Sequence, residues 1–139
     1  MCTGITIAWR DIPTRLIRKH QLDERIIQRS ETADKEILFM QRHRQPLLPV
    51  FYQGELRILP WGNRQRHSNA PLAWWCEVAT LESGAWSMYH PEPVEILANF
   101  GLERGVWFQM AFKAQSFTTS TNNPASTCFC NPRPTTIRS

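Results

Sequence analysis

The sequence predicts an α+β fold: one compact, β-rich domain with a mostly antiparallel, barrel-like sheet and a few peripheral helices. Three observations favour this class. The 139 residues suit one domain, and 42% of them are hydrophobic, which is enough for a modest core. Short apolar, strand-forming runs separated by turn residues recur along most of the chain. No run approaches the length of a membrane span, so no membrane partner is expected.

The first forty residues combine strand and helix patterns. The run TGITIAW alternates isoleucine with smaller residues, as a strand does. From 11 to 30 the apolar spacing becomes helical, with Pro13 suited to the first turn, and one helix or two short helices fit it equally. The run EILFM at 36–40 predicts a buried strand.

The clearest local pattern is LLPVFYQGELRILPW. Two strand-forming runs meet at Gln53-Gly54, and the second run alternates apolar with charged residues, which predicts a β-hairpin. A polar loop, GNRQRHSNAP, follows it. Residues 72–81 and 104–112 predict two further strands, and the prolines of HPEPVE between them are expected to limit regular structure.

The composition changes after Phe117. The domain is therefore predicted to span residues 1–117. Residues 118–139 are rich in Ser, Thr, Asn and Pro and contain too few apolar side chains to bury, so we expect a loosely ordered tail.

The net charge of +4 and the pI near 9.2 favour a polyanionic partner. Arg42 and Arg44 precede the predicted hairpin, and Arg64 and Arg66 follow it. Guanidinium groups can hold phosphates beside Trp61, and stacking of a base on an aromatic side chain contributes about 1–3 kcal/mol. This pattern predicts a groove for single-stranded nucleic acid, and the alternative is a solvated basic rim.

The four cysteines show no paired CxxC spacing. Neither a disulfide framework nor a structural zinc site is indicated, and we expect no cofactor. The start of the chain lacks the apolar core of a secretory signal, so a cytoplasmic location is expected.

Cys2 is a candidate nucleophile. If Met1 is removed, as is usual before a small second residue, Cys2 presents a free amine and a thiol on one two-carbon unit. Their unperturbed pKa values are about 7.7–8.0 and about 8.5, so both have a reactive fraction at neutral pH. The amine can capture an aldehyde as a Schiff base, and intramolecular attack by the thiolate then closes a thiazolidine. The alternative is an unreactive, buried cysteine.

The segments MC, RHRQPLLPVFYQGELRILPWGN, WCEVATLESGAW and GVWFQM resemble, in this order, the landmarks of the SOS-response-associated peptidase family, the abasic-site processing proteins. A Trp-Gly pair ends a strand in that family, and Trp61-Gly62 matches it. The resemblance covers roughly residues 1–112. It implies a monomer that binds single-stranded DNA at an abasic site, associates with the nucleoid when bound, and links Cys2 to the ring-opened sugar. The peptidase name reflects removal of residues before the cysteine, here Met1.

The resemblance also implies an asparagine, a glutamate and a later histidine near the cysteine. Trp75 stands at the position of the family's asparagine, and Asn69 is a nearby substitute in a different register. Glu77 can supply a carboxylate, and the alternative for Glu77 is a surface charge. Gln109 in WFQM stands where the family has the glutamate of Tyr-Glu-Trp. An amide can form hydrogen bonds but cannot serve as an acid or a base. The late histidine has no counterpart.

The leading hypothesis is thus a DNA-damage protein that binds single-stranded DNA and crosslinks Cys2 to an abasic-site aldehyde. A second hypothesis is a non-catalytic module that binds single-stranded nucleic acid. A third is a truncated, inactive member of the family.

Overall fold

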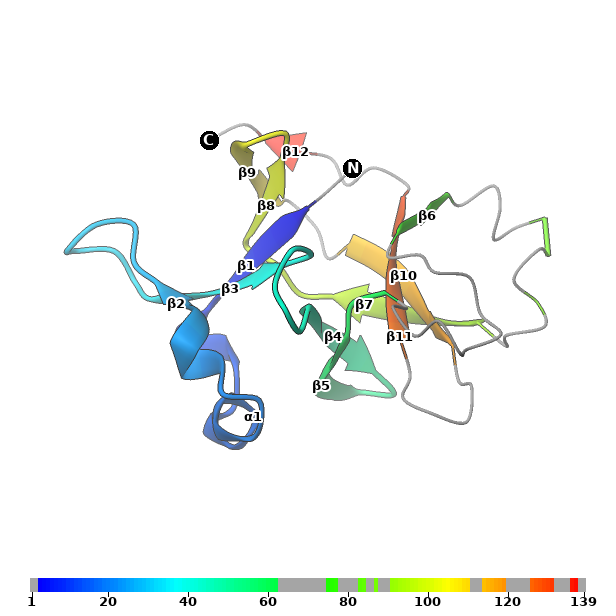
Figure 1. Ribbon diagram of the computed structural model, residues 1–139, viewed down its shortest axis with the longest axis horizontal. Coiled ribbons are helices and arrows are strands. Elements are labelled where there is room, and N and C mark those ends of the chain that lie inside the picture. Colours follow the sequence, from blue (N-terminus) through cyan, green and yellow to red (C-terminus); the bar gives the residue numbers. More distant parts are fainter. Residues whose placement is uncertain are drawn as a thin grey trace.

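The computed structural model describes residues 3–62, 75–77, 83–84, 87, 91–110, 114–119, 126–131 and 136–137. The described chain is largely strand with a few helical turns (Figure 1). Its elements are, in order, β1 (Gly4–Ala8), η1 (Trp9–Asp11), α1 (Thr14–Lys19), η2 (Leu22–Arg25), β2 (Ile26–Ile27), β3 (Glu36–Met40), β4 (Leu47–Tyr52), β5 (Glu55–Pro60), β6 (Trp75–Glu77), β7 (Pro91–Ile96), β8 (Phe100–Glu103), β9 (Val106–Met110), β10 (Ala114–Thr119), β11 (Ser126–Asn131) and β12 (Thr136–Ile137).

The described strands form two sheets. The first sheet has the order β12-β9-β8-β1-β3-β2, and the second has the order β5-β4-β7-β10-β11-β6. Neighbouring strands are antiparallel except for β11 and β6, which are parallel. The expected β-rich, mostly antiparallel α+β fold is confirmed. The strands do not close into one barrel, however, because each sheet keeps two open edges among the described residues.

The first sheet is organised around β1. This strand pairs with β3 on one side, where Gly4 lies opposite Met40, and with β8 on the other, where Gly4 lies opposite Leu102. Because side chains alternate between the faces of a strand, Ile5 and Ile7 point to one face and Gly4 and Thr6 to the other. The first face belongs to the core, and the second is called the outer face below.

The predicted hairpin is confirmed, with β4 and β5 paired from Leu47 opposite Pro60 to Tyr52 opposite Glu55. Its turn residues Gln53 and Gly54 have φ values of 53° and 76°. Two consecutive positive φ angles define the turn that matches the twist of a hairpin. Arg104 and Gly105, with φ values of 51° and 77°, join β8 to β9 in the same way.

Both sheets contribute to one hydrophobic core. α1 and η2 cover part of it, so the helical stretch after Asp11 is two short helices rather than one. The strand predicted at 36–40 is confirmed as β3, and its Ile37 and Phe39 are fully buried. The buried core residues are Ile5, Ile7, Ile12, Leu16, Ile17, Leu22, Ile37, Phe39, Leu48, Val50, Leu56, Ile58, Trp61, Val94, Ile96 and Phe108.

The prolines of HPEPVE do not prevent a strand, contrary to expectation, because Pro91 and Pro93 both lie in β7. The backbone N–H of Leu97 donates to the carbonyl of Pro49 on β4. Since N–H groups alternate between the two edges of a strand, positions 91 and 93 face the same edge as 97. The pairing of β4 with β7 ends at Glu95, so this edge of β7 has no paired strand at positions 91 and 93. A proline, which lacks an N–H, therefore loses no hydrogen bond at either position.

Part of the segment 118–139 lies in strands of the described structure. β11 pairs with β10 over Ser116–Thr119 and Ser126–Phe129, and β12 pairs with β9 at the edge of the first sheet. β11 thus belongs to the second sheet and β12 to the first. Among the described residues, no helix is long and apolar enough to cross a membrane.

Candidate functional site

The start of β1 is fixed by both of its neighbours. The Thr3 N–H donates to the carbonyl of Leu102 on β8 at 2.8 Å, and the Gln41 N–H, just after β3, donates to the carbonyl of Thr3 at 3.0 Å. Cys2 itself lies outside the described residues. Thr3, the next residue in the sequence, is the first one that the structure describes.

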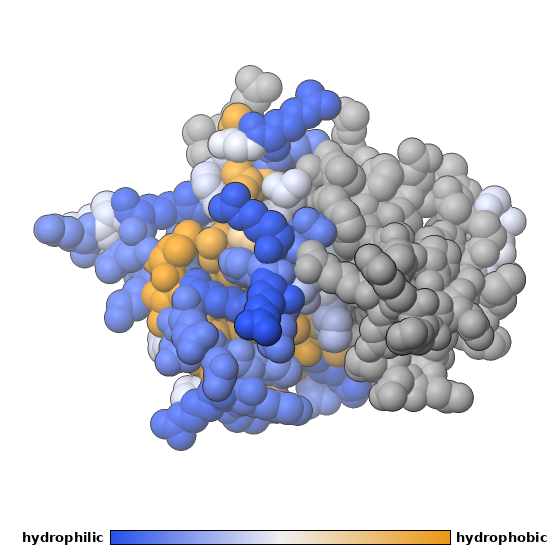
Figure 2. Space-filling view, viewed as in Figure 1, coloured by the Kyte–Doolittle hydropathy of each residue, from blue (hydrophilic) through white to orange (hydrophobic). Residues whose placement is uncertain are grey.

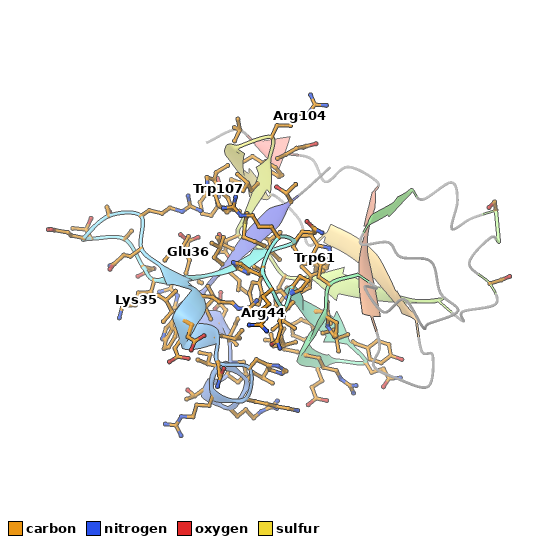
Figure 3. The ribbon with its side chains drawn as sticks, in the orientation of Figure 1. Lys35, Glu36, Arg44, Trp61, Arg104 and Trp107 are labelled. Carbon is orange, nitrogen blue, oxygen red and sulfur yellow. The ribbon has the colours of Figure 1, made fainter. Side chains whose placement is uncertain are left out.

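A turn of mainly polar and basic residues lies against this position. Residues 41–45, called the basic turn below, connect β3 to the start of β4 and include Arg42, His43 and Arg44. Arg42 and Arg44 are exposed, as a DNA-binding role requires. Figure 3 places Arg44 near the centre of the view, where Figure 2 shows strongly hydrophilic residues on the surface.

Arg25, at the end of η2, contacts two residues of the basic turn. Its Nη2 donates to the carbonyl of Gln45 at 2.8 Å, and its Nη1 lies 3.5 Å from Nδ1 of His43. The same Nδ1 accepts the backbone N–H of Met40 at 3.3 Å. Since Nδ1 accepts, the neutral imidazole carries its proton on Nε2.

The electrostatics keep this imidazole neutral. Burial lowers the pKa of His43, and the guanidinium groups of Arg25 and Arg42 lower it further. Burial also lowers the pKa of His20, with Lys19 and Arg25 adding to the effect. Burial lowers the pKa of Arg25 itself, against the raising effect of Glu24, but a guanidinium stays charged at any physiological pH.

These two histidines make stability sensitive to acid. Each histidine has a lower pKa in the folded protein than the ordinary value of 6.5, which applies to the unfolded chain. At a pH between the folded-state and unfolded-state pKa values, the unfolded chain therefore binds more protons than the folded protein. The contribution of the two neutral histidines to the free energy of unfolding is complete above about pH 6.5 and is lost as the pH falls below it.

Denaturant unfolding at pH 7.5 and 5.5 is expected to show lower stability at pH 5.5. His43→Asn keeps an acceptor near Nδ1 without titrating, so this variant should lose less stability on acidification, and an equal loss would contradict the assignment.

The structure corrects the role predicted for Trp61-Gly62. Trp61 is 1% exposed and is the largest fully buried side chain of the described residues, so no base can stack on it. Gly62 is also buried, with a φ of 77° that favours glycine. The Trp61 N–H donates to the carbonyl of Pro46 at 2.8 Å. The pair therefore brings the end of β5 beside the basic turn instead of offering an aromatic surface.

Of the remaining catalytic candidates, the structure describes Gln109 and Glu77, and neither β9 nor β6 pairs with β1. Gln109 is exposed on β9, opposite Phe100, which in turn lies opposite Thr6. Two strand spacings of about 4.8 Å separate β9 from β1, so Gln109 is no neighbour of the chain start. Glu77 lies on β6, at the edge of the second sheet. Asn69, Arg64 and Arg66, like Cys2, lie outside the described residues.

A second polar cluster, which the sequence did not indicate, lies on the outer face of the first sheet. Glu36 is 7% exposed, accepts the hydroxyl of the fully buried Thr6 at 2.7 Å, and pairs with Nε of Arg29 at 2.7 Å. The Arg29 guanidinium also lies over the rings of Phe100 and Trp107, 4.5 Å and 4.9 Å from their centroids. Figure 3 shows Glu36 and Trp107 on the same side of this sheet. The cluster satisfies its own charges, so we assign it a structural role.

Removing the carboxylate should therefore destabilise the fold. Glu36→Leu leaves the Thr6 hydroxyl and the Arg29 guanidinium without their acceptor, and we expect a loss of about 1–3 kcal/mol in the free energy of unfolding. Glu36→Gln keeps an acceptor for Thr6 and should cost less. Glu31→Leu removes the same charge at an exposed position and should have almost no effect. Chemical denaturation measures all three, and equal stability of Glu36→Leu and the wild type would refute the structural role.

No metal centre is indicated in the part of the chain that the structure describes, where no three His, Cys, Asp or Glu side chains cluster. Comparison with protein-family models, with curated proteins and with solved structures finds no match. The function therefore has to be argued from the residues at the start of β1 and around it.

Proposed function

We propose that this chain is a DNA-damage protein that binds single-stranded DNA and uses Cys2 to form a thiazolidine with the aldehyde of an abasic site. One observation supports this reading most directly. The carbonyl of Thr3 accepts the N–H of Gln41, so the residue that follows Cys2 in the sequence lies beside the turn that carries Arg42 and Arg44. A reactive aminothiol and a set of phosphate-binding groups would thus share one end of the first sheet.

The chemistry needs no further cofactor. The α-amine of Cys2 adds to the aldehyde carbon, and loss of one water gives the imine. The thiolate then adds to the imine carbon, the nitrogen takes up a proton, and the five-membered ring closes with one water released overall. The second step gains a large effective molarity because amine and thiol belong to one residue. The arginines of the basic turn would hold the flanking phosphates.

The test is a crosslinking assay on a denaturing gel. Purified protein is incubated with a single-stranded oligonucleotide that has one abasic site, with the same oligonucleotide without the lesion as the control. We expect a heat-stable, slower band with the abasic strand alone. Absence of this band under conditions where the strand is bound would exclude the crosslinking activity.

A non-catalytic module for single-stranded nucleic acid is the second candidate. Gln109 favours it, because an amide cannot serve as an acid or a base and because β9 lies two strands away from β1. Salt-sensitive binding to intact and abasic strands alike, with no covalent product, would support this candidate. Cooperative unfolding would argue against an inactive remnant, because such a remnant should melt broadly.

A further inference from the structure

We propose that one guanine base of the bound single strand docks on the outer face of the first sheet. The residues of this base site are Arg29, Phe100, Trp107 and Gln109. The inference deepens the proposed function and rests on its DNA-binding part, because it names the base that the strand would present. It also supplies the stacking surface that the buried Trp61 cannot offer.

Two half-buried aromatic residues lie on adjacent strands of this face. Phe100 on β8 is paired with Thr6, whose side chain points to the outer face, and also with Gln109 on β9. Paired residues point to the same face, and so do alternate residues of one strand, so Trp107 lies there too. Both rings keep part of their surface in solvent. Half-exposed rings on a sheet are surfaces on which unpaired bases stack.

The Arg29 guanidinium is held in place before any ligand binds. Its Nε donates to Oε2 of Glu36 at 2.7 Å, and its Cζ lies 4.5 Å and 4.9 Å from the ring centroids of Phe100 and Trp107. Its two Nη groups form no hydrogen bond with the residues that the structure describes, and 33% of the side chain is exposed. Because these donors have already lost rotamer freedom, a ligand can bind them at lower entropic cost.

Gln109 adds a neutral polar group beside the rings. Its side chain is exposed, and the amide forms no hydrogen bond within the described part of the chain. The amide oxygen can accept a hydrogen bond and the amide nitrogen can donate two. The base site thus combines two aromatic rings, a pair of donors and one amide, which is the set of groups that recognises a planar base with a polar edge.

The charges of the site favour a base over a phosphate. The Glu36 carboxylate, which is 7% exposed, already balances the charge of Arg29. A phosphate would bring a second negative charge close to this carboxylate, whereas a neutral base brings none. The structural role assigned to the ion pair is unchanged, because Nε alone holds the carboxylate.

The free donors favour guanine among the bases. Guanidinium groups donate and never accept, so the bound edge has to carry acceptors. O6 and N7 of guanine accept from one arginine as a bidentate pair, whereas adenine presents an amino donor beside its N7. The Gln109 amide oxygen can then accept from the N1–H of the same guanine.

The base site lies at the level of Thr3 along the first sheet. The carbonyl of Leu102 accepts the Thr3 N–H, and Leu102 is paired with Trp107. Two strand spacings of about 4.8 Å separate β9 from β1. A guanine bound there would lie near the abasic site in the same strand, so the site predicts a sequence context for the proposed crosslink.

The first measurement compares strands that differ in one base. An intact oligothymidine with one central guanine is compared with the same strand carrying adenine or 7-deazaguanine, which lacks the N7 acceptor. The guanine strand is expected to bind about tenfold more tightly than the other two, because guanine alone among them offers both acceptors to Arg29. Equal affinity for the three strands would overturn the site.

The second measurement compares variants. Arg29→Lys keeps the charge beside Glu36 but lacks the planar donor pair, so it should lose the roughly tenfold preference for guanine. Arg10→Lys makes the same change at an exposed arginine and should keep the preference. Gln109→Ala should reduce the preference about fivefold, and since Gln109 is exposed, this variant answers the question even if Arg29→Lys fails to fold. A wild-type preference in either variant would refute the proposal.

Guanosine alone, as a third probe, separates the base site from the proposed function. It is expected to shift the indole N–H signal of Trp107 in the NMR spectrum. A shift without binding of any strand would support the base site and reject the proposed DNA binding. Equal binding of all three strands would leave the DNA binding standing and remove the base site. Neither a shift nor binding would reject both.

Discussion

Cys2→Ser is expected to abolish the covalent product with abasic single-stranded DNA. A serine hydroxyl is not ionised at neutral pH, so it cannot close the ring on the imine, and the imine alone hydrolyses. The denaturing gel should show no more crosslinked band than the intact oligonucleotide gives. Binding to the same strand should be unchanged, because the phosphate contacts proposed for the basic turn do not involve the thiol.

Two further variants make this result specific. Cys76→Ser makes the same chemical change on β6, in the second sheet, and should crosslink like the wild type. Insertion of one alanine between Met1 and Cys2 keeps the thiol but moves the free amine to another residue, and it should abolish the product as fully as Cys2→Ser. Full crosslinking by the alanine insertion would show that the amine and the thiol do not act as one unit.

Trp61→Ala is expected to have the largest effect on stability. The side chain is 1% exposed within the shared core, and truncating a buried tryptophan costs about 3–5 kcal/mol through lost burial and the remaining cavity. For a domain of this size the melting temperature should fall by roughly 10 °C or more. Thermal and denaturant unfolding measure the loss directly.

The conservative variant separates a core role from a DNA-stacking role. Trp61→Phe keeps an aromatic ring of smaller volume, so it should lose part of the stability while binding single-stranded DNA as tightly as the wild type at a temperature where both are folded. A loss of affinity without a loss of stability would contradict the burial of Trp61 and restore a stacking role.

Short sequence patterns predicted the strands and turns that depend mainly on neighbouring residues. The β4–β5 hairpin follows from Gln53-Gly54 between two apolar runs, and β3 follows from EILFM. The turn at Arg104 and Gly105 has the same backbone geometry but was missed, because the strand before it, FGLE, has only two apolar residues. β7 was missed for another reason: whether a proline disrupts a strand depends on which edge its nitrogen faces, and only the pairing reveals that.

Tertiary structure determined most of the candidate site. A tryptophan between arginines has the same sequence signature whether it stacks on a base or fills the core, and only the packing of both sheets buries Trp61. Arg25 and Gln45 are 20 residues apart, and no periodic pattern connects η2 with the basic turn. The pairing of Thr3 with Leu102 and Gln41 likewise depends on long-range strand order.

Mass spectrometry of the purified protein and of its product with abasic DNA tests the central claim most directly. The account predicts a protein mass without Met1, a product equal to protein plus oligonucleotide minus one water, and fragment ions that place the link on Cys2. A protein that retains Met1, or a product linked through any other residue, would contradict the account.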